Sequence, residues 1–244
     1  MKVAVMGGTG RIGSLVVEFL NAAGHEAVPH ARSTGVNLLT GEGLDRALAG
    51  AGAVVDVTSA PAIDDSARDF FQTTTGNLVA AGAGAGVRHA VVLSIVGADL
   101  VPDFGYYRAK VHQENVLASG PVPFTVVRAT QFFEFVDDIM SWTTDGDTVR
   151  LPATQMQPIA AADVARDLAG VAVGAPLGGT RNIAGPDVFR LDELGRITLA
   201  ARGDSRTVTT DATAGLFATM PDKAIIAKEG AHITPTHYRD WLRG

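Results

Sequence analysis

The hydrophobic pattern of the first 24 residues changes once, from a short apolar run to helical spacing. Val3–Met6 is apolar throughout and is short enough for one buried strand. Beyond residue 11, apolar side chains recur three and four positions apart, which is typical of a helix packed on one face; these are Ile12, Leu15, Val16, Phe19 and Leu20. Gly7, Gly10 and Gly13 lie between the two patterns, and Gly24 follows the second. The stretch therefore predicts a strand, a glycine-rich turn and a helix ended by glycine.

Runs of apolar and β-branched residues continue to alternate with helical spacing as far as residue 128. Further strands are predicted over 25–30, 36–39, 53–57, 89–94 and 124–128. Helices are predicted over 44–50 and 103–119, with a long helix between them that Asp64 or Asp65 caps and that ends in the small-residue run 80–86. This strict alternation favours an α/β fold, a doubly wound parallel sheet with helices on both faces.

The rhythm changes after residue 128, where shorter elements and more aromatic residues follow. Helices are predicted over 131–143, 163–173 and 191–201, and extended segments over 148–151, 181–184 and 207–210. Thr234 and Pro235 have the order of an N-cap and a first helical residue, which predicts a final helix. We expect two parts of one compact unit, a sheet domain over 1–152 and a smaller C-terminal lobe over 153–244, with a substrate cleft between them.

A strand, a glycine turn and a helix in this order form a frame for binding a dinucleotide. The chain must turn tightly, bring its backbone close to a pyrophosphate and present the free N–H groups of a helix N-terminus. The spacing in this sequence is G-x-x-G-x-x-G, and the alternative reading of such a triplet is an ordinary turn. Its place between a predicted strand and a predicted helix favours the nucleotide site.

Composition narrows the class of protein. The 244 residues allow one or two domains, and 46% hydrophobic with 19% charged residues is typical of a packed globular chain. The net charge of −6 offers no basic surface for nucleic acid. No apolar run approaches the ~20 residues of a membrane span, the first residues do not resemble a signal peptide, and cysteine is absent. From these features we expect a cytoplasmic protein. We also expect no metal site, because the six histidines lack metal-ligand spacing.

The end of the second predicted strand bears on which dinucleotide binds. Proteins that read the 2′-hydroxyl of NAD usually carry Asp or Glu there, whereas this chain has H-A-R-S over residues 30–33. Arg32, and Arg11 in the glycine turn, are placed to meet the 2′-phosphate of NADP; two solvated loop arginines are the alternative. We expect NADP(H) to be favoured over NAD(H), with Asn37 in place of an acid near the adenine amino group.

A second group of residues has the chemistry of carbonyl reduction. Ser94 ends a predicted strand, and Tyr106 and Lys110 are four apart on one predicted helix face. Hydride reduction of a carbonyl needs a proton for the nascent alkoxide; a tyrosine can supply it, and a nearby ammonium lowers the tyrosine pKa from about 10. Tyr-x-x-x-Lys also occurs by chance as a surface tyrosine beside a solvated lysine. Tyr107, three positions before Lys110, is the alternative proton donor.

Several of these motifs resemble one known family. The turn GGTGRIG, the strand end LSIVG, the segment YYRAK and the run SGPVPFTVVRATQFFEF are similar to atypical short-chain dehydrogenase/reductases, in particular to the NmrA-like group. Two later segments, IAAADVARDL and NIAGPDVFRLDEL, are similar to the C-terminal part of that group. The resemblance covers nearly the whole chain and implies a Rossmann-type sheet that binds NAD(P)(H).

The resemblance also implies residue roles. It places the pyrophosphate at the glycine turn, the 2′-phosphate at Arg32, the adenosine and ribose along 58–61 and the nicotinamide near 130–132. It matches Ser94, Tyr106 and Lys110 to the reductase triad. The expected cofactor contacts are Gly7, Thr9, Gly10, Arg11, Ile12, Gly13, Arg32, Ser33, Asn37, Thr58, Ser59, Ala60, Lys110, Thr130, Gln131 and Phe132.

We expect an NADPH-dependent oxidoreductase that reduces a small carbonyl or quinone substrate. The NmrA-like group also includes members that have lost the triad and act as nucleotide-responsive regulators, so a non-catalytic NADP(H) sensor that contacts a protein partner is the alternative. A third reading is an isomerase or epimerase that keeps its nucleotide. The sequence leaves the substrate open, and it leaves open whether the protein is a monomer or a homodimer.

Overall fold

The computed structural model describes residues 1 to 244. The fold is organised around a seven-stranded sheet. The spatial order is β12-β9-β5-β4-β3-β1-β2, and the pairs β1–β2, β1–β3, β3–β4 and β9–β12 are parallel. The strands are β1 (Lys2–Met6), β2 (Glu26–His30), β3 (Ala53–Asp56), β4 (His89–Ile95), β5 (Phe124–Ala129), β9 (Gly179–Ala184) and β12 (His232–Ile233). The predicted α/β fold with a doubly wound parallel sheet is confirmed.

The direction in which strands are added to the sheet reverses at β1. From β1 the chain moves outward to β2 and then crosses back to continue with β3 and β4. Met6 lies opposite both His30 and Asp56, so the carboxyl ends of these three strands are level. Ligands of open parallel sheets bind outside the carboxyl ends of the strands at such a reversal. The segments that follow Met6, His30 and Asp56 are therefore the first place to search for a site.

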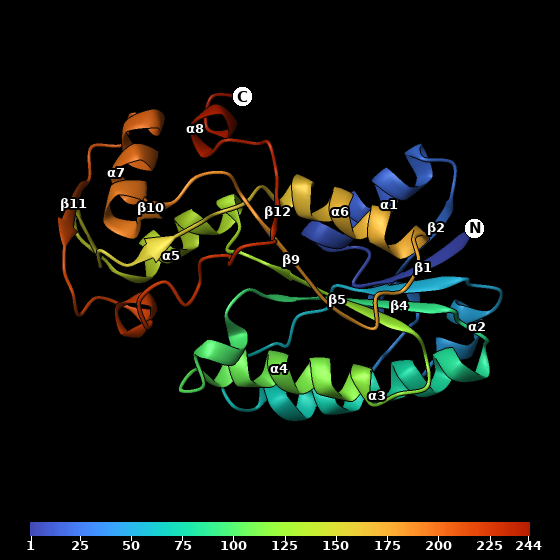
Figure 1. The fold of residues 1–244 in the computed structure, drawn as a ribbon. Coiled ribbons are helices and arrows are strands. Elements are labelled where there is room, and N and C mark those ends of the chain that lie inside the picture. Colours follow the sequence, from blue (N-terminus) through green and yellow to red (C-terminus); the bar gives the residue numbers. More distant parts are fainter. The chain divides into compact units, whose positions relative to one another are not determined.

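Helices cover both faces of this sheet (Figure 1). On one face lie α1 (Arg11–Ala22) and α6 (Ala161–Val173). On the other face α3 (Ala67–Gly84) and α4 (Gly105–Ala118) pack side by side. None of the helices combines the length and the apolar content that crossing a bilayer requires.

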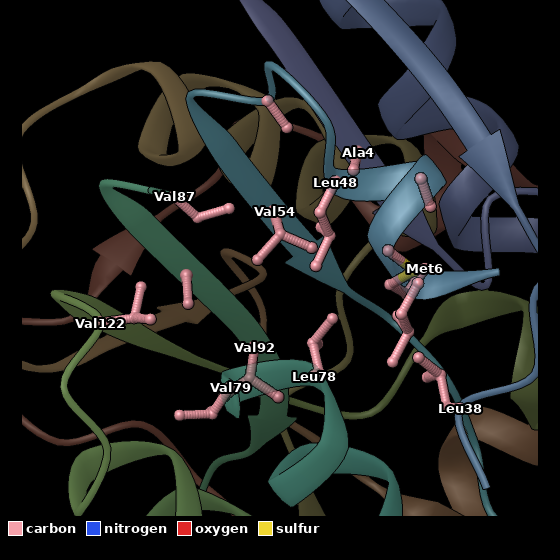
Figure 2. Packing of buried hydrophobic residues seen from close by; sticks show 14 of the residues in the cluster. Ala4, Met6, Leu38, Leu48, Val54, Leu78, Val79, Val87, Val92 and Val122 are labelled. Carbon is pink, nitrogen blue, oxygen red and sulfur yellow. The ribbon is translucent and has the colours of Figure 1, made fainter. Parts of the chain in front are cut away.

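Apolar side chains fill the space between the sheet and the helices α2 (Leu44–Leu48) and α3. Alternate residues of a strand point to the same face, and Ala4 and Met6 of β1 accordingly enter one cluster with Val54 of β3 (Figure 2). Leu48 and Leu78 cover this cluster from the helices. Burying one such side chain contributes roughly 1.5–3 kcal/mol to the free energy of unfolding. The cluster therefore stabilises the packing of α2 and α3 on the sheet.

The chain forms two compact units that each contain two segments. The first unit is Met1–Arg128 with Val164–Arg181, and the second is Ala129–Asp163 with Asn182–Gly244. The predicted boundary after residue 152 falls inside the first segment of the second unit. The chain therefore enters the second unit, returns to the first through α6, and enters the second again.

The second unit contains short elements around two small sheets. A three-stranded sheet has the order β11-β7-β6, and β8 pairs with β10 antiparallel. Outside the strands of the main sheet, its elements are η3 (Phe133–Phe135), α5 (Val136–Trp142), β6 (Thr144–Asp145), β7 (Thr148–Leu151), β8 (Gln155–Met156), β10 (Phe189–Arg190), α7 (Leu191–Arg202), β11 (Thr207–Thr210), η4 (Leu216–Thr219) and α8 (Tyr238–Trp241).

One prediction in the first unit is wrong, and another is confirmed. The predicted strand over 36–39 is a single bridge between Asn37 and Glu42, because the Asn37 side-chain oxygen accepts a hydrogen bond from the Leu39 N–H at 3.0 Å and closes a turn. The small-residue run 80–86 contains the predicted end of the long helix, since α3 continues into it to Gly84 and a turn follows over 85–86. Alanine is the best helix former, and the helix ends only where Gly86 adopts a φ of +73°.

Two predicted helices in the second unit begin later than expected. Helical structure predicted from residue 131 begins at Phe133, because the Gln131 carbonyl and the Phe133 N–H are bonded to the backbone of Ile159. The last helix begins at Tyr238 instead of Pro235. Thr234 donates its N–H to the carbonyl of Ala184 at 2.9 Å and so extends the strand pairing of β12.

Candidate functional site

The glycine turn after β1 is packed so closely that side chains are excluded from two of its positions. A Cβ on Gly8 would lie 2.6 Å from the Cα of Pro29, and one on Gly13 would lie 2.2 Å from the carbonyl oxygen of Gly7. Gly7 has a φ of +76°, and its N–H and that of Gly8 donate to the carbonyl of His30 at 2.9 and 3.2 Å. The turn is thereby held against the carboxyl end of β2.

Helix α1 begins directly from this turn without a capping side chain. Its N-cap is Gly10, which has an extended backbone, and no acidic residue lies in the first turn. The first N–H groups of a helix and its macrodipole attract anions. The predicted phosphate contacts, Thr9 to Gly13, therefore form a tight backbone turn at the positive end of a 12-residue helix.

The carboxyl end of β2 carries basic side chains and no acid, as predicted. The next segment is the short η1 (Arg32–Thr34), on which Arg32 and Ser33 are exposed. Burial lowers the pKa of His30, and the positive charges of Lys2 and Arg46 lower it further. Arg46 belongs to α2, and its guanidinium would lie 3.4 Å from a Cβ on Gly35. Sequence analysis did not identify Arg46, because its approach to this loop depends on the packing of α2.

The loop after β3 contains the predicted contacts Thr58, Ser59 and Ala60. Asp56, the last residue of β3, accepts hydrogen bonds on Oδ1 from the N–H of Thr58 at 2.9 Å and from its hydroxyl at 2.7 Å. A Cβ on Gly7 would lie 3.2 Å from the Thr58 nitrogen. The glycine turn and this loop are therefore in contact, at the strand reversal where the topology predicts a ligand.

Two members of the predicted triad, Tyr106 and Lys110, lie together on α4. Burial raises the pKa of the Tyr106 hydroxyl, and the nearby Ser59 side chain and Ala60 backbone oppose this shift. The Lys110 ammonium lies 4.6 Å from the centre of the Phe71 ring, and the Tyr106 ring centre lies 6.1 Å from the same ring. Burial lowers the pKa of Lys110 to about 8. This face of α4 thus brings a tyrosine hydroxyl and an amine close to the loop after β3.

The third member, Ser94, is not hydrogen-bonded to this pair. It is buried near the end of β4, and its hydroxyl has no hydrogen-bond partner. Tyr107, the alternative proton donor, is buried and packs its ring edge-on against Phe104 at 5.5 Å. The Tyr106 hydroxyl lies near the loop after β3, where Ser59 and Ala60 influence its pKa.

In the second unit, Thr130 and Gln131 present buried polar atoms without partners. The Thr130 N–H donates to Ile183 and the Gln131 carbonyl accepts from Ile159, so the backbone is fixed on both sides. The Thr130 hydroxyl and both polar atoms of the Gln131 amide have no hydrogen bond. Buried polar groups are nearly always satisfied, which favours a ligand at these side chains. The neighbouring Phe132 is half-buried.

Replacing Gln131 with leucine is expected to stabilise the protein while weakening its cofactor affinity. An unsatisfied buried polar group costs about 1–3 kcal/mol, and leucine of similar size removes that cost together with the groups that would bind a ligand. Thermal unfolding and NADPH titration measure the two effects. Thr75→Val is the matched control, because the buried Thr75 hydroxyl also lacks a partner; it should stabilise without changing affinity. Unchanged affinity of Gln131→Leu would remove the residue from the site.

Comparison with known sequences identifies a family and one curated relative. Residues 7–172 match a family model described as NAD(P)H-binding. A (4-alkanoyl-5-oxo-2,5-dihydrofuran-3-yl)methyl phosphate reductase of Streptomyces griseus subsp. griseus is 34% identical over 193 residues. That match spans 72% of this chain and 63% of the relative.

Solved structures with the same fold include an epimerase and two reductases. The UDP-N-acetylglucosamine 4-epimerase of Bacillus cereus is 18% identical, with a TM-score of 0.78 and coverage of 100% of this chain and 97% of that one. An NADPH-dependent quinone oxidoreductase of Escherichia coli with NADPH is 20% identical (TM-score 0.70; coverage 86% and 78%). The triphenylmethane reductase of Citrobacter sp. with NADP(H) is 19% identical (TM-score 0.66; coverage 86% and 79%). At these identities the likeness concerns the fold.

Proposed function

The chain belongs to the NAD(P)H-binding family, and on that premise we propose that it is an NADPH-dependent reductase of a small carbonyl or quinone compound. The observation that carries the proposal is that Tyr106 and Lys110 both contact Phe71, with the Tyr106 hydroxyl near the loop that touches the glycine turn. The curated relative supports a reductase, and its name describes a substrate with alkanoyl and oxo groups.

The residues fit a dinucleotide on structural grounds. Cβ atoms would fill the turn at Gly8 and Gly13, and the buried hydroxyl of Ser94 and amide of Gln131 lack partners. The glycine turn and the start of α1 would hold the pyrophosphate. Thr58 to Ala60 would line the adenosine and ribose, and Thr130 to Phe132 would contact the nicotinamide.

In this mechanism the protein supplies the proton and the orientation. NADPH supplies a hydride when bound. The Tyr106 hydroxyl donates its proton to the substrate oxygen, so that one hydride and one proton convert a carbonyl to an alcohol or a quinone to a hydroquinone. The charged Lys110 stabilises the tyrosinate that remains, and the Ser94 hydroxyl donates a hydrogen bond to the substrate oxygen.

Removal of the Arg32 side chain is expected to weaken NADPH binding and leave NADH binding unchanged. A charge-assisted hydrogen bond to the 2′-phosphate is worth roughly 1.5–3 kcal/mol, which corresponds to roughly 10–150-fold in affinity; NADH lacks this phosphate. Fluorescence titration of Arg32→Ala with both dinucleotides measures the difference. Arg88→Ala is the control, since Arg88 precedes β4 at the opposite end of the strands. An equal loss for both dinucleotides would contradict the assignment.

One observation favours a second function, a non-catalytic NADP(H) sensor. The Ser94 hydroxyl has no hydrogen bond to Tyr106 or Lys110, and Lys110 is buried, so the three side chains do not form one hydrogen-bonded group. A sensor would bind NADP⁺ and NADPH with unequal affinity and consume no NADPH.

The test of the proposed function is a titration of NADPH, NADP⁺, NADH and NAD⁺, followed by a screen of quinones and small carbonyl compounds for NADPH consumption. Tight NADPH binding with turnover supports the reductase. Unequal NADP⁺ and NADPH affinity without turnover supports the sensor. If none of the four dinucleotides binds, both functions are wrong.

A further inference from the structure

A chain of hydrogen bonds connects Lys110 to a buried carboxylate that the reductase mechanism does not use. The Lys110 ammonium donates to the Gln113 side-chain oxygen, and the Gln113 amide nitrogen donates to Oδ2 of Asp56 at 3.1 Å. All three side chains lie in the interior, with exposures of 4%, 0% and 3%. These hydrogen bonds join α4 to the end of β3.

The polarity of these contacts fits a carboxylate that carries its charge. Asp56 accepts every hydrogen bond recorded for it, two on Oδ1 from Thr58 and one on Oδ2 from Gln113. An ionised carboxylate is an acceptor only, whereas an ammonium is a donor only. The Gln113 amide has its oxygen toward the cation and its N–H toward the anion. Its dipole is therefore aligned to couple the two charges.

We propose that Asp56, acting through Gln113, is the positioning residue that keeps Lys110 charged and fixed on the Tyr106 side of α4. The proposal rests on the proposed reductase function for the role of Lys110. The same carboxylate also fixes the loop near the Tyr106 hydroxyl, since it accepts two hydrogen bonds from Thr58, one residue before Ser59. One buried anion would thus arrange both the proton donor and the amine.

Besides Asp56, the negative charge of Glu114 also raises the pKa of Lys110. Glu114 of α4 forms an ion pair with Arg128 of β5 at 2.6 Å, and Arg128 also binds Asp99 at 2.7 Å. α3 contributes the uncharged Phe71 ring, and Tyr106 lies one turn earlier on α4. Burial lowers the pKa of Lys110 and raises that of Asp56, and the attraction between the two charges opposes both shifts.

Lysine-selective NMR tests the proposal without reference to activity. The chain contains only four lysines, Lys2, Lys110, Lys223 and Lys228, so ¹³Cε-lysine labelling yields four signals, and Lys110→Arg assigns the one of interest. In Asp56→Asn the titration midpoint of Lys110 should move to lower pH by about 1 pH unit or more, because an opposite charge that favoured the ammonium is lost. The new amide has only one acceptor oxygen, so it can keep the bond from Gln113 or those from Thr58 but not both, and in either case the negative charge is lost.

Gln113→Met is the second variant, in case Asp56→Asn does not fold. It retains the carboxylate but removes the acceptor of the lysine, so the midpoint should move in the same direction. Thr75→Val is the control. It changes a buried side chain of α3 that forms no hydrogen bond with Lys110, Gln113 or Asp56. A Lys110 midpoint that is equal in wild type and both variants would overturn the proposal.

The pH profile of kcat/KM supplies the functional readout. Activity should fall at alkaline pH as Lys110 loses its charge, near pH 8 in the wild type. In both variants this alkaline limb should move to lower pH together with the NMR midpoint. A purely structural role would lower the maximum rate without moving the limb, and that result would overturn the proposal. If the wild type reduces no carbonyl or quinone, the proposed reaction is wrong, and the NMR midpoint alone decides whether Asp56 positions Lys110.

Discussion

Gly13→Ala is expected to lower NADPH affinity and the stability of the first unit together. The added Cβ would lie 2.2 Å from the Gly7 oxygen and 2.7 Å from the Gly7 carbonyl carbon and the Gly8 Cα. All three atoms belong to the backbone, so no side-chain rotation can relieve the clash. Overpacking of this kind costs roughly 1–3 kcal/mol. If binding requires the original turn to be restored, the same energy reduces affinity by roughly 5–150-fold.

Gly76→Ala is the matched control for this variant. Gly76 lies inside α3, and a Cβ there would have no atom within 4 Å. Alanine in a helix interior is favoured over glycine by about 0.5–1 kcal/mol, so this variant should be slightly more stable and bind NADPH normally. Thermal unfolding and fluorescence titration compare the two. Normal NADPH affinity in Gly13→Ala would show that the glycine turn does not hold the dinucleotide.

Tyr106→Phe is expected to reduce kcat/KM for a carbonyl substrate by roughly 10²–10⁴-fold, the usual contribution of a general acid. The variant keeps the ring that packs on Phe71, so folding and NADPH affinity should be preserved. Steady-state kinetics with NADPH in excess measure the loss. For a quinone, whose reduction depends less on protonation by the protein, the loss should be smaller.

Tyr107→Phe separates the two adjacent tyrosines. The Tyr107 ring is buried and packs on Phe104, and the variant retains that packing, so most activity should remain. A loss below about tenfold in Tyr106→Phe on a carbonyl substrate would remove its role as proton donor, since a general acid contributes more than that. If Tyr107→Phe instead shows the large loss, the neighbouring hydroxyl is the donor.

The alternation of apolar runs and helical spacing in the first 128 residues predicted the parallel sheet and the glycine turn correctly. Such patterns are local: the period of a strand or helix, and a glycine between them, are set by residues a few positions apart. The absence of an acidic residue at the end of β2 could also be predicted from the sequence, because it concerns only the short segment 30–33. The chemistry of Tyr106 and Lys110 was visible for the same reason, as two side chains one helical turn apart.

The tertiary structure decided what depends on residues distant in the chain. The sequence did not show that α6 belongs to the first unit, that β9 and β12 extend the sheet, or that 36–39 forms a turn. It also did not show that Lys110 is buried or that Gln113 links it to Asp56, a residue 57 positions from Gln113. A carboxylate after an apolar run is equally compatible with solvent or with an ion pair. Only the packing of α4 against the sheet determines which partner it meets, and therefore which charges surround the candidate catalytic lysine.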